Sequence, residues 1–229
     1  MEPILILHGA LGAQDQFAEL AARLSQSREV HLLNFSGHGA DTAMPEVFLP
    51  EVFMADVLNY LDQHDLKSVN IFGYSMGGYI ALLMAVHHPD RVSSVLTLGT
   101  KMDWNPEIAA RETTMLNPDK IAEKVPAFAN ALQNRHGASR WRMVLEKTAT
   151  MMRYLGEHRP LDEAALRKIA VPVTIALSDA DEMVSRAEAE QAAVWIPGAR
   201  FQLLEGGRHA IEKCPVETLA ALVENNLVY

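Results

Sequence analysis

Short apolar runs alternate with amphipathic stretches along most of the chain. Six runs are expected to be buried strands: Ile4 to Leu7, Val30 to Asn34, Val69 to Phe72, Val92 to Leu98, Val171 to Leu177 and Arg200 to Leu204. Between them, apolar residues recur every three to four positions, which predicts helices with one face on a sheet. Such helices are expected at Phe17 to Leu24, Met54 to Leu61, Tyr79 to Val86, Arg186 to Trp195 and Val216 to Val223. This alternation is typical of βαβ units with a mostly parallel sheet flanked by helices.

Residues 103–161 interrupt that alternation. Apolar residues keep helical spacing from Ile121 to Leu132 and from Trp141 to Met152, with no strand pattern between them. Four methionines lie there, and methionine forms adaptable apolar surface suited to covering a pocket. We therefore predict a helical cap inserted into a single domain of residues 1–229. The alternative is that these residues form a satellite core beneath their own helices.

Composition limits the possible partners and compartment. The 229 residues carry a formal net charge of −9, whereas nucleic-acid binding requires clustered Lys and Arg. Cys214 is the only cysteine, which excludes an intrachain disulfide and fits a reducing cytoplasm. The first residues lack a basic segment, and the apolar run Ile4 to Leu7 is too short for a signal peptide or membrane span. We expect a soluble cytoplasmic protein with no nucleic-acid or membrane partner; its oligomeric state stays open.

The strongest chemical signal is the segment Gly73-Tyr74-Ser75-Met76-Gly77-Gly78. It follows a predicted strand and precedes a predicted helix, as a nucleophile on a sharp strand-to-helix turn requires. Small residues two positions before and after Ser75 let the flanking elements approach each other. The turn also aims the backbone N–H of Met76 at an oxyanion forming beside Ser75. The alternative is a glycine-rich turn with an idle serine.

A second oxyanion donor is expected in the loop His8-Gly9-Ala10-Leu11-Gly12, after the first strand. A glycine-rich loop there brings a backbone N–H to the same place, and Ala10 is our candidate. A plain glycine turn between strand and helix would explain Gly9 and Gly12 but would leave His8 without a role.

These motifs together resemble the α/β-hydrolase family over nearly the whole chain. The resemblance rests on the His8-Gly9 loop, the Ser75 segment and three further stretches in the family's order: Asn34 to Asp41, His88 to Val92 and Gly206 to His209. It implies an α/β-hydrolase fold with a cap after the sixth family strand, where residues 103–161 lie. Family members usually open with two further antiparallel strands, so the sheet here is expected to be truncated at its N-terminal side.

The resemblance also implies a triad in the chain order serine, acid, histidine. His209 stands in the loop before the last helix, where the family places the base, although Arg208 replaces the glycine that often precedes it. Asp181 aligns with the acid that orients the imidazole. Asp179 is then a turn residue, and Asp103 is a third candidate because some family members carry the acid after that earlier strand.

We expect a cofactor-free serine hydrolase that cleaves a small, apolar carboxylic ester through an acyl-enzyme. Neither a metal-ligand pattern nor a nucleotide-binding glycine motif occurs in the sequence. Four residues are expected to contact substrate: Leu11, Tyr74, Trp141 and Met152. Two alternatives stay open, because fold does not decide among chemistries. One is a C–C hydrolase or lyase on the same triad, and the other is a ligand-binding or signalling protein with little turnover.

Overall fold

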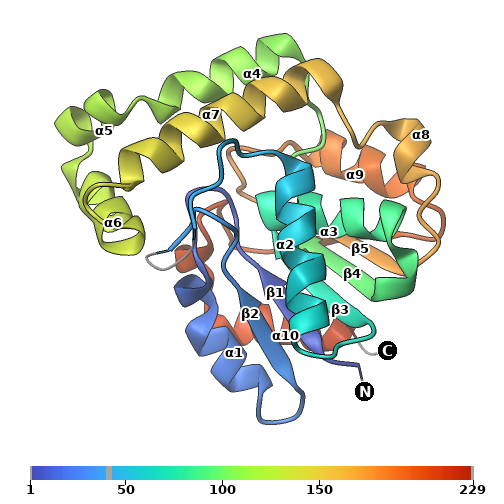
Figure 1. The fold of residues 1–229 in the computed structure, drawn as a ribbon. Helices are drawn as coiled ribbons and strands as arrows, with labels where there is room; N and C mark the ends of the chain where they lie inside the picture. Colours follow the sequence, from blue (N-terminus) through green and yellow to red (C-terminus); the bar gives the residue numbers. More distant parts are fainter. Residues whose placement is uncertain (1, 40–42, 228–229) are drawn as a thin grey trace.

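A computed structural model describes residues 2–39 and 43–227, and its centre is a six-stranded parallel sheet (Figure 1). The strands are β1 (Ile4–Leu7), β2 (Val30–Leu33), β3 (Val69–Tyr74), β4 (Val92–Leu98), β5 (Val173–Ser178) and β6 (Arg200–Leu204). Their spatial order is β2-β1-β3-β4-β5-β6. The order reverses between β1 and β3, and ligands of open parallel sheets bind beyond the carboxyl ends of the strands at such a switch point.

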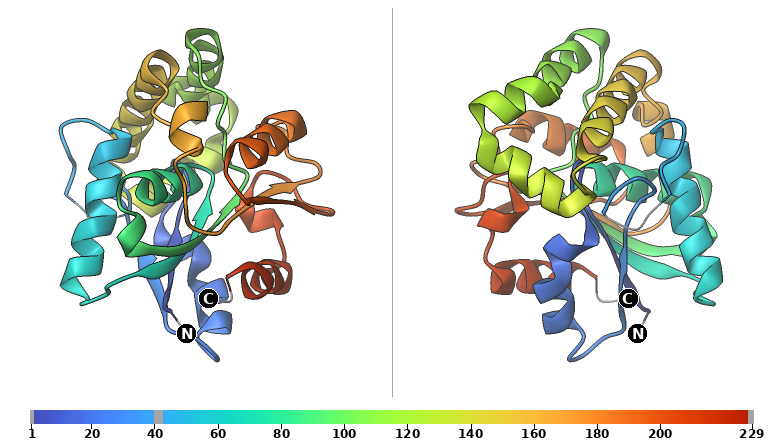
Figure 2. Two further views of the ribbon diagram at one scale, coloured as in Figure 1. Left: turned by 90° about the vertical axis from the view of Figure 1, so that its right-hand side faces the viewer. Right: turned by 60° about the vertical axis from the view of Figure 1, so that its left-hand side comes forward.

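Alternate side chains of each strand enter different halves of the core. Ile4 and Ile6 pack with α1 (Ala18–Leu24) and α10 (Val216–Asn226), whereas Leu5 and Leu7 belong to the apolar cluster on the opposite face. That second cluster contains residues of α2 (Pro50–Gln63), α3 (Met76–His87) and α9 (Arg186–Trp195). Because both faces are covered by helices (Figure 2), the strands read as continuous apolar runs.

The helix that follows the Ser75 turn is the most buried in the structure's core. Nearly every residue of α3 from Met76 to Ala85 is buried, in keeping with a segment that is apolar on all sides. The helix ends at His87, just before Pro89, because proline disfavours helical backbone at the residue preceding it. A rigid α3 therefore anchors the residue at its N-terminus, Ser75.

Between β4 and α8 (Glu163–Leu166) the described chain contains helices and no strand. The helices are α4 (Pro106–Thr113), α5 (Pro118–Lys124), α6 (Pro126–His136) and α7 (Trp141–His158). Figure 1 shows α4 and α7 side by side above the carboxyl edge of the sheet. The pattern from Ile121 to Leu132 reads as one helix, but Pro126 divides it into α5 and α6, since Val125 leaves the helical conformation before the proline.

The apolar residues of this helical segment divide between two cores. Trp104, Met151 and Leu155 join the main cluster on the face of α2 and α3. A smaller cluster lies within the segment itself, formed by Ile121, Ala129, Leu132, Trp141 and Leu145. The apolar side chains of this segment therefore pack partly into the main core and partly into a core of their own. Over residues 2–39 and 43–227, no helix is long and apolar enough to cross a bilayer.

Candidate active site

Ser75 lies at the turn between β3 and α3 with a backbone conformation that L-residues rarely adopt. Its φ is 51° and its ψ is −115°, which is a strained combination for a residue other than glycine. Hydrogen bonds from outside its own turn and helix help to hold it there: its amide donates to the Leu98 carbonyl at 2.9 Å, and the Thr100 hydroxyl donates to its carbonyl at 3.0 Å. Strain maintained by surrounding contacts is a feature of functional sites.

Gly73 and Gly77 allow this turn to form. A Cβ atom on Gly73 would lie 2.5 Å from the backbone of Gly78, and one on Gly77 would collide with the carbonyl oxygen of Leu7. Any larger residue at either position would push β3, α3 and β1 apart. Small residues are therefore needed two positions before and two positions after Ser75, because the flanking strands and helix approach each other closely there.

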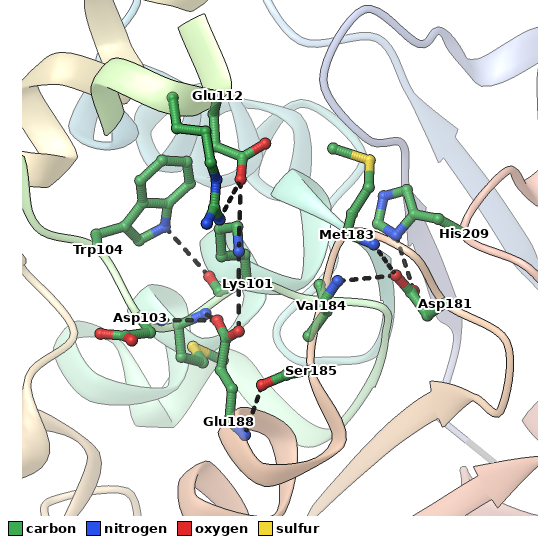
Figure 3. A network of polar contacts seen from close by, with 12 residues as sticks. Lys101, Asp103, Trp104, Glu112, Asp181, Met183, Val184, Ser185, Glu188 and His209 are labelled. Atoms are coloured by element: carbon green, nitrogen blue, oxygen red, sulfur yellow. Dashed lines mark hydrogen bonds and ion pairs between the residues drawn. The ribbon is translucent and has the colours of Figure 1, made fainter. Parts of the chain in front are cut away.

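Asp181 and His209 meet beyond the end of β5, although 28 positions separate them. His209 Nδ1 donates to Asp181 Oδ2 at 2.8 Å, and Asp181 Oδ1 accepts from the amides of Met183 and Val184 at 2.8 and 2.9 Å (Figure 3). Burial alone would raise the pKa of Asp181, but the His209 ring and the two amides lower it below its ordinary value. An ionised Asp181 fixes the Nδ1–H tautomer and leaves Nε2 as the basic nitrogen.

Gly99 brings this pair toward Ser75. It directly follows β4 with φ of 63°, and a Cβ atom there would lie 3.0 Å from Asp181 Oδ2 and 3.3 Å from His209 Cε1. The carbonyl of its neighbour Leu98 accepts a hydrogen bond from the Ser75 amide. The side chains of Ser75, Asp181 and His209 therefore gather at the C-terminal end of β4. The described residues show no hydrogen bond from Ser75 Oγ to His209, and such bonds often tighten only when substrate binds.

The two rival acids lie elsewhere. The Asp103 carboxylate is 52% exposed and 3.8 Å from Arg159. Asp179 is exposed, and its amide donates to the Leu204 carbonyl in the turn after β5. Of the three candidates, Asp181 alone is hydrogen-bonded to the His209 ring among the described residues. Arg208, next to the histidine, is exposed to solvent.

The loop after β1 reaches the same place. A Cβ atom on Gly9 would lie 3.2 Å from Ser75 Cβ, and Ala10 and Met76 line a pocket together with Ser75. The loop is a tight turn closed by Gly12 N–H donating to the Gly9 carbonyl at 3.1 Å. Leu11 has a left-handed φ of 59° inside that turn, which is a costly conformation for a branched residue.

Contacts from α6 hold Leu11 in that conformation. Its carbonyl accepts a hydrogen bond from His136 Nε2 at 3.0 Å and another from Arg135 Nη1 at 3.1 Å. The Arg135 and His136 side chains therefore tie the helical segment to the candidate oxyanion loop. This role of His136 has no local signal in the sequence, because the contact joins two residues that lie 125 positions apart along the chain.

Three buried histidines, His8, His38 and His136, lie in contact beneath this loop. The ring centroids of His8 and His38 are 5.1 Å apart, and those of His38 and His136 are 5.8 Å apart. His8 Nδ1 donates to the Gly9 carbonyl while Nε2 accepts from the Phe35 amide, which gives His8 the structural role that the sequence left open. The motif containing His38 continues to Ala40 and Asp41, which lie outside the described residues.

Burial keeps these histidines neutral. It lowers the pKa of His8 to about 3 and that of His136 to about 4, and it also lowers the pKa of His38. His136 needs the neutral form for its contacts, because Nδ1 accepts from the Gly39 amide at 3.1 Å while Nε2 donates to Leu11. A second proton on the ring would lie on Nδ1, which could then no longer accept the hydrogen bond from the Gly39 amide.

We expect acid to destabilise the fold through this cluster. The unfolded chain protonates each histidine below its ordinary pKa of 6.5, whereas folded His136 stays neutral until about pH 4, so stability falls as pH drops through that window. For His136 the loss at about pH 5 is about 2 kcal/mol. Urea unfolding of His136→Gln and the unmodified protein at about pH 7 and pH 5 measures it. An unchanged difference between the two proteins at both pH values would contradict the prediction.

Of the four residues expected to contact substrate, one lies in the described lining of the pocket beside Ser75. Met152 lines it, together with Met151 and Leu155 of α7 and Trp104. Trp141 lies outside this lining, in the small cluster with Leu132 and Leu145, and Leu11 packs against that same cluster. The helical segment therefore contacts the pocket through the C-terminal half of α7 and through Trp104.

Tyr74 has a different position from the one expected. Its side chain is 8% exposed in the core on the α1 and α10 side, and its hydroxyl donates to the His209 carbonyl at 2.8 Å. The ring centroids of Tyr74 and His209 are 5.5 Å apart. Tyr74 thus supports the loop that carries His209 instead of lining the pocket. The described residues contain no group of three or more His, Cys, Asp or Glu side chains placed to hold a metal ion.

Comparison with known families identifies the family of this chain. The family model described as "alpha/beta hydrolase fold" matches residues 2–162. The chain belongs to the alpha/beta hydrolase fold family. The resemblance found in the sequence motifs and the predicted fold class are thereby confirmed.

Relatives within this family have diverse names. A probable alcohol acetyltransferase from Cyberlindnera jadinii is 30% identical over 110 residues, a match that covers 47% of this chain and only 31% of that protein. The putative carbamate hydrolase RutD from Pseudomonas savastanoi pv. phaseolicola is 24% identical over 91% of this chain and 87% of its own length. The crystal structure of the enol-lactonase from Burkholderia xenovorans LB400 superposes with a TM-score of 0.81 at 19% identity, covering 100% of this chain and 92% of that one. Such low identity to the enol-lactonase shows a shared fold alone.

Proposed function

We propose that the chain is a cofactor-free serine hydrolase that cleaves small carboxylic esters, with Ser75 as nucleophile, His209 as general base and Asp181 as orienting acid. The observation that carries the proposal is the buried Asp181–His209 hydrogen bond of 2.8 Å beside the strained Ser75 turn. An idle serine in a glycine-rich turn would need neither a paired histidine nor a strained backbone. A ligand carrier would gain nothing from orienting one imidazole nitrogen.

The arrangement supports an acyl-enzyme mechanism. His209 Nε2 takes the hydroxyl proton as Ser75 Oγ attacks the ester carbonyl, and the negative oxygen is bound by the amides of Ala10 and Met76. The intermediate collapses, and the alcohol leaves with the proton from His209. Water then attacks the acyl group with the same proton transfers, which releases the acid and restores Ser75. Asp181 stays ionised and stabilises the imidazolium that forms in each half.

A fluorophosphonate probe tests the proposed nucleophile. It requires an activated serine, so we expect one adduct, on Ser75, with burst release of alcohol from activated esters. Peptide mapping by mass spectrometry locates the adduct. Absence of any adduct on the native protein, while an established serine esterase is labelled in parallel, would favour the ligand-binding alternative. Labelling without ester turnover would favour a C–C hydrolase or lyase on the same residues.

The pocket supports a small apolar acyl group, because most of its lining is apolar and its cavity volume is about 50 Å³. We propose that the helical segment of residues 103–161 acts as the cap over this site. Its Met151 and Met152 side chains fill part of the space above Ser75. Methionine adapts to different ligand shapes, which suits a cap that closes around short chains.

We expect kcat/KM to rise roughly tenfold from acetyl to butyryl esters and then to level off or fall. Each buried methylene contributes about 0.8 kcal/mol until the pocket is full. Met152→Ala enlarges the pocket and should move the optimum to longer chains. Met143→Ala is the matched control, since Met143 lies on the same helix but is 39% exposed. If kcat/KM does not change with acyl chain length in any of the three proteins, the cap has no part in substrate selection.

A further inference from the structure

Lys101 is the one charged residue among the described residues that line the Ser75 pocket. It stands two positions after Gly99, at the same strand end as the candidate catalytic residues. Its side chain is only 12% exposed. Pockets of this kind combine apolar walls with a few placed polar groups that determine which ligand binds. Ser75, Ala10 and Met76 of the pocket lining have roles in the proposed reaction, whereas Lys101 has none.

The buried Glu112 and the partly buried Glu188 flank the Lys101 ammonium at ion-pair distance without accepting a hydrogen bond from it. Nζ lies 3.9 Å from Glu112 Oε1 and 3.8 Å from Glu188 Oε2, both beyond the normal range of an N–H···O hydrogen bond (Figure 3). Over residues 2–39 and 43–227, the ammonium has ion-pair contacts but no protein hydrogen bond. The two carboxylates hold the side chain in place at ion-pair distance, and its N–H groups stay available for a hydrogen bond.

The glutamates themselves have closer partners. Glu112 Oε1 accepts from Arg111 at 2.9 Å. Glu188 Oε1 accepts from the amides of Met102 and Asp103 at 2.6 and 2.7 Å. Both glutamates are therefore committed to the protein, and neither is free to move to the lysine without losing shorter hydrogen bonds. The geometry assigns the Lys101 donors to a group that enters the pocket.

The charge balance indicates what that group is. Lys101 and Arg111 together neutralise Glu112 and Glu188, so the cluster already has no net charge. A substrate carboxylate would add a third negative charge close to the two glutamates and would be repelled. A neutral carbonyl or hydroxyl oxygen accepts a hydrogen bond from the ammonium without that cost.

We propose that Lys101 is a specificity-determining residue that donates a hydrogen bond to a neutral oxygen on the acyl chain of the substrate. The inference rests on the proposed function and narrows it from apolar esters to oxo- or hydroxyacyl esters. The hydrogen bond from Lys101 would make the short apolar pocket selective for acyl chains that carry one internal oxygen. Lys101 binds the substrate in this scheme and transfers no proton.

Matched ester pairs test the proposal. Ethyl valerate and ethyl 4-oxopentanoate have the same chain, and ethyl butyrate and ethyl 3-oxobutanoate form a second pair; monoethyl succinate supplies the anion. Acid release is followed by titration at constant pH, and each rate is divided by that ester's alkaline hydrolysis rate. We expect kcat/KM of at least one oxo-ester to exceed that of its partner by about tenfold or more, and succinate to be the poorest substrate.

Variants separate recognition from a structural role. Lys101→Met removes the donors and should bring the oxo-to-hydrocarbon ratio close to one, mainly through KM. The double variant Lys101→Met with Glu188→Gln restores charge balance and serves if the single variant fails to fold. Lys120→Met, at an exposed position of α5, is the matched control and should keep the ratio of the unmodified protein.

The outcomes distinguish this proposal from the proposed function. A ratio near one in the unmodified protein, or a ratio that Lys101→Met leaves unchanged, overturns the role of Lys101 while ester hydrolysis at Ser75 still stands. A preference for succinate overturns the neutral-oxygen class. Failure of Ser75 to react with a fluorophosphonate or with any ester overturns the hydrolase proposal itself.

Discussion

Ser75→Ala is expected to lower kcat for ester hydrolysis about a millionfold and to abolish fluorophosphonate labelling. The variant lacks the oxygen that forms the acyl-enzyme. Part of the rate above the uncatalysed reaction should survive, because the Ala10 and Met76 amides still stabilise a carbonyl oxygen attacked by water. Single-turnover kinetics with an activated ester measures both effects.

The folded state should tolerate this change. Backbone hydrogen bonds from Ser75 N–H to Leu98 and from Thr100 to the Ser75 carbonyl do not involve the hydroxyl, so the melting temperature should shift by only a few degrees. Ser25→Ala, at an exposed position after α1, is a control for handling and expression. Turnover retained in Ser75→Ala would place the nucleophile elsewhere and end the proposed mechanism.

Local signals made most of the sheet predictable. β1 and β4 begin and end where the apolar runs do, because strands buried on both faces have few polar positions to blur their limits. The turn at Ser75 was equally predictable, because contacts close to the strand-turn-helix unit require its glycines. Helix α4 escaped prediction, although Asn105 caps its first turn and Pro106 occupies its first position.

Residues placed by long-range packing were not predictable in the same way. Trp141 and Met152 share one helix and one apolar pattern, yet one fills the small cluster of the helical segment and the other lines the pocket. Only the docking of α7 on the sheet decides between them. The sequence did not indicate that Lys101 lines the pocket, because a lysine after a strand usually points to solvent. Its burial depends on Glu112 and Glu188, which two other helices supply.

Asp181→Asn is expected to lower kcat at least a hundredfold, and up to about ten-thousandfold where the wrong imidazole tautomer is stabilised. The amide of asparagine can present N–H to His209 Nδ1, which would move the ring proton to Nε2 and remove the base. Asp181 also accepts from the Met183 and Val184 amides through Oδ1. Asparagine oxygen can keep those two bonds and so direct its NH2 group at the histidine.

Asp103→Asn and Asp179→Asn are the matched controls, and each should change kcat by less than about tenfold. Asp103 is half exposed beside Arg159, and Asp179 is exposed in a turn, so neither carboxylate contacts the His209 ring. Parallel measurement of kcat, KM and melting temperature separates a catalytic loss from unfolding. A larger loss in Asp103→Asn than in Asp181→Asn would move the acid to the end of β4. In that case the 2.8 Å contact between Asp181 and His209 would be a loop-stabilising bond with no part in proton transfer.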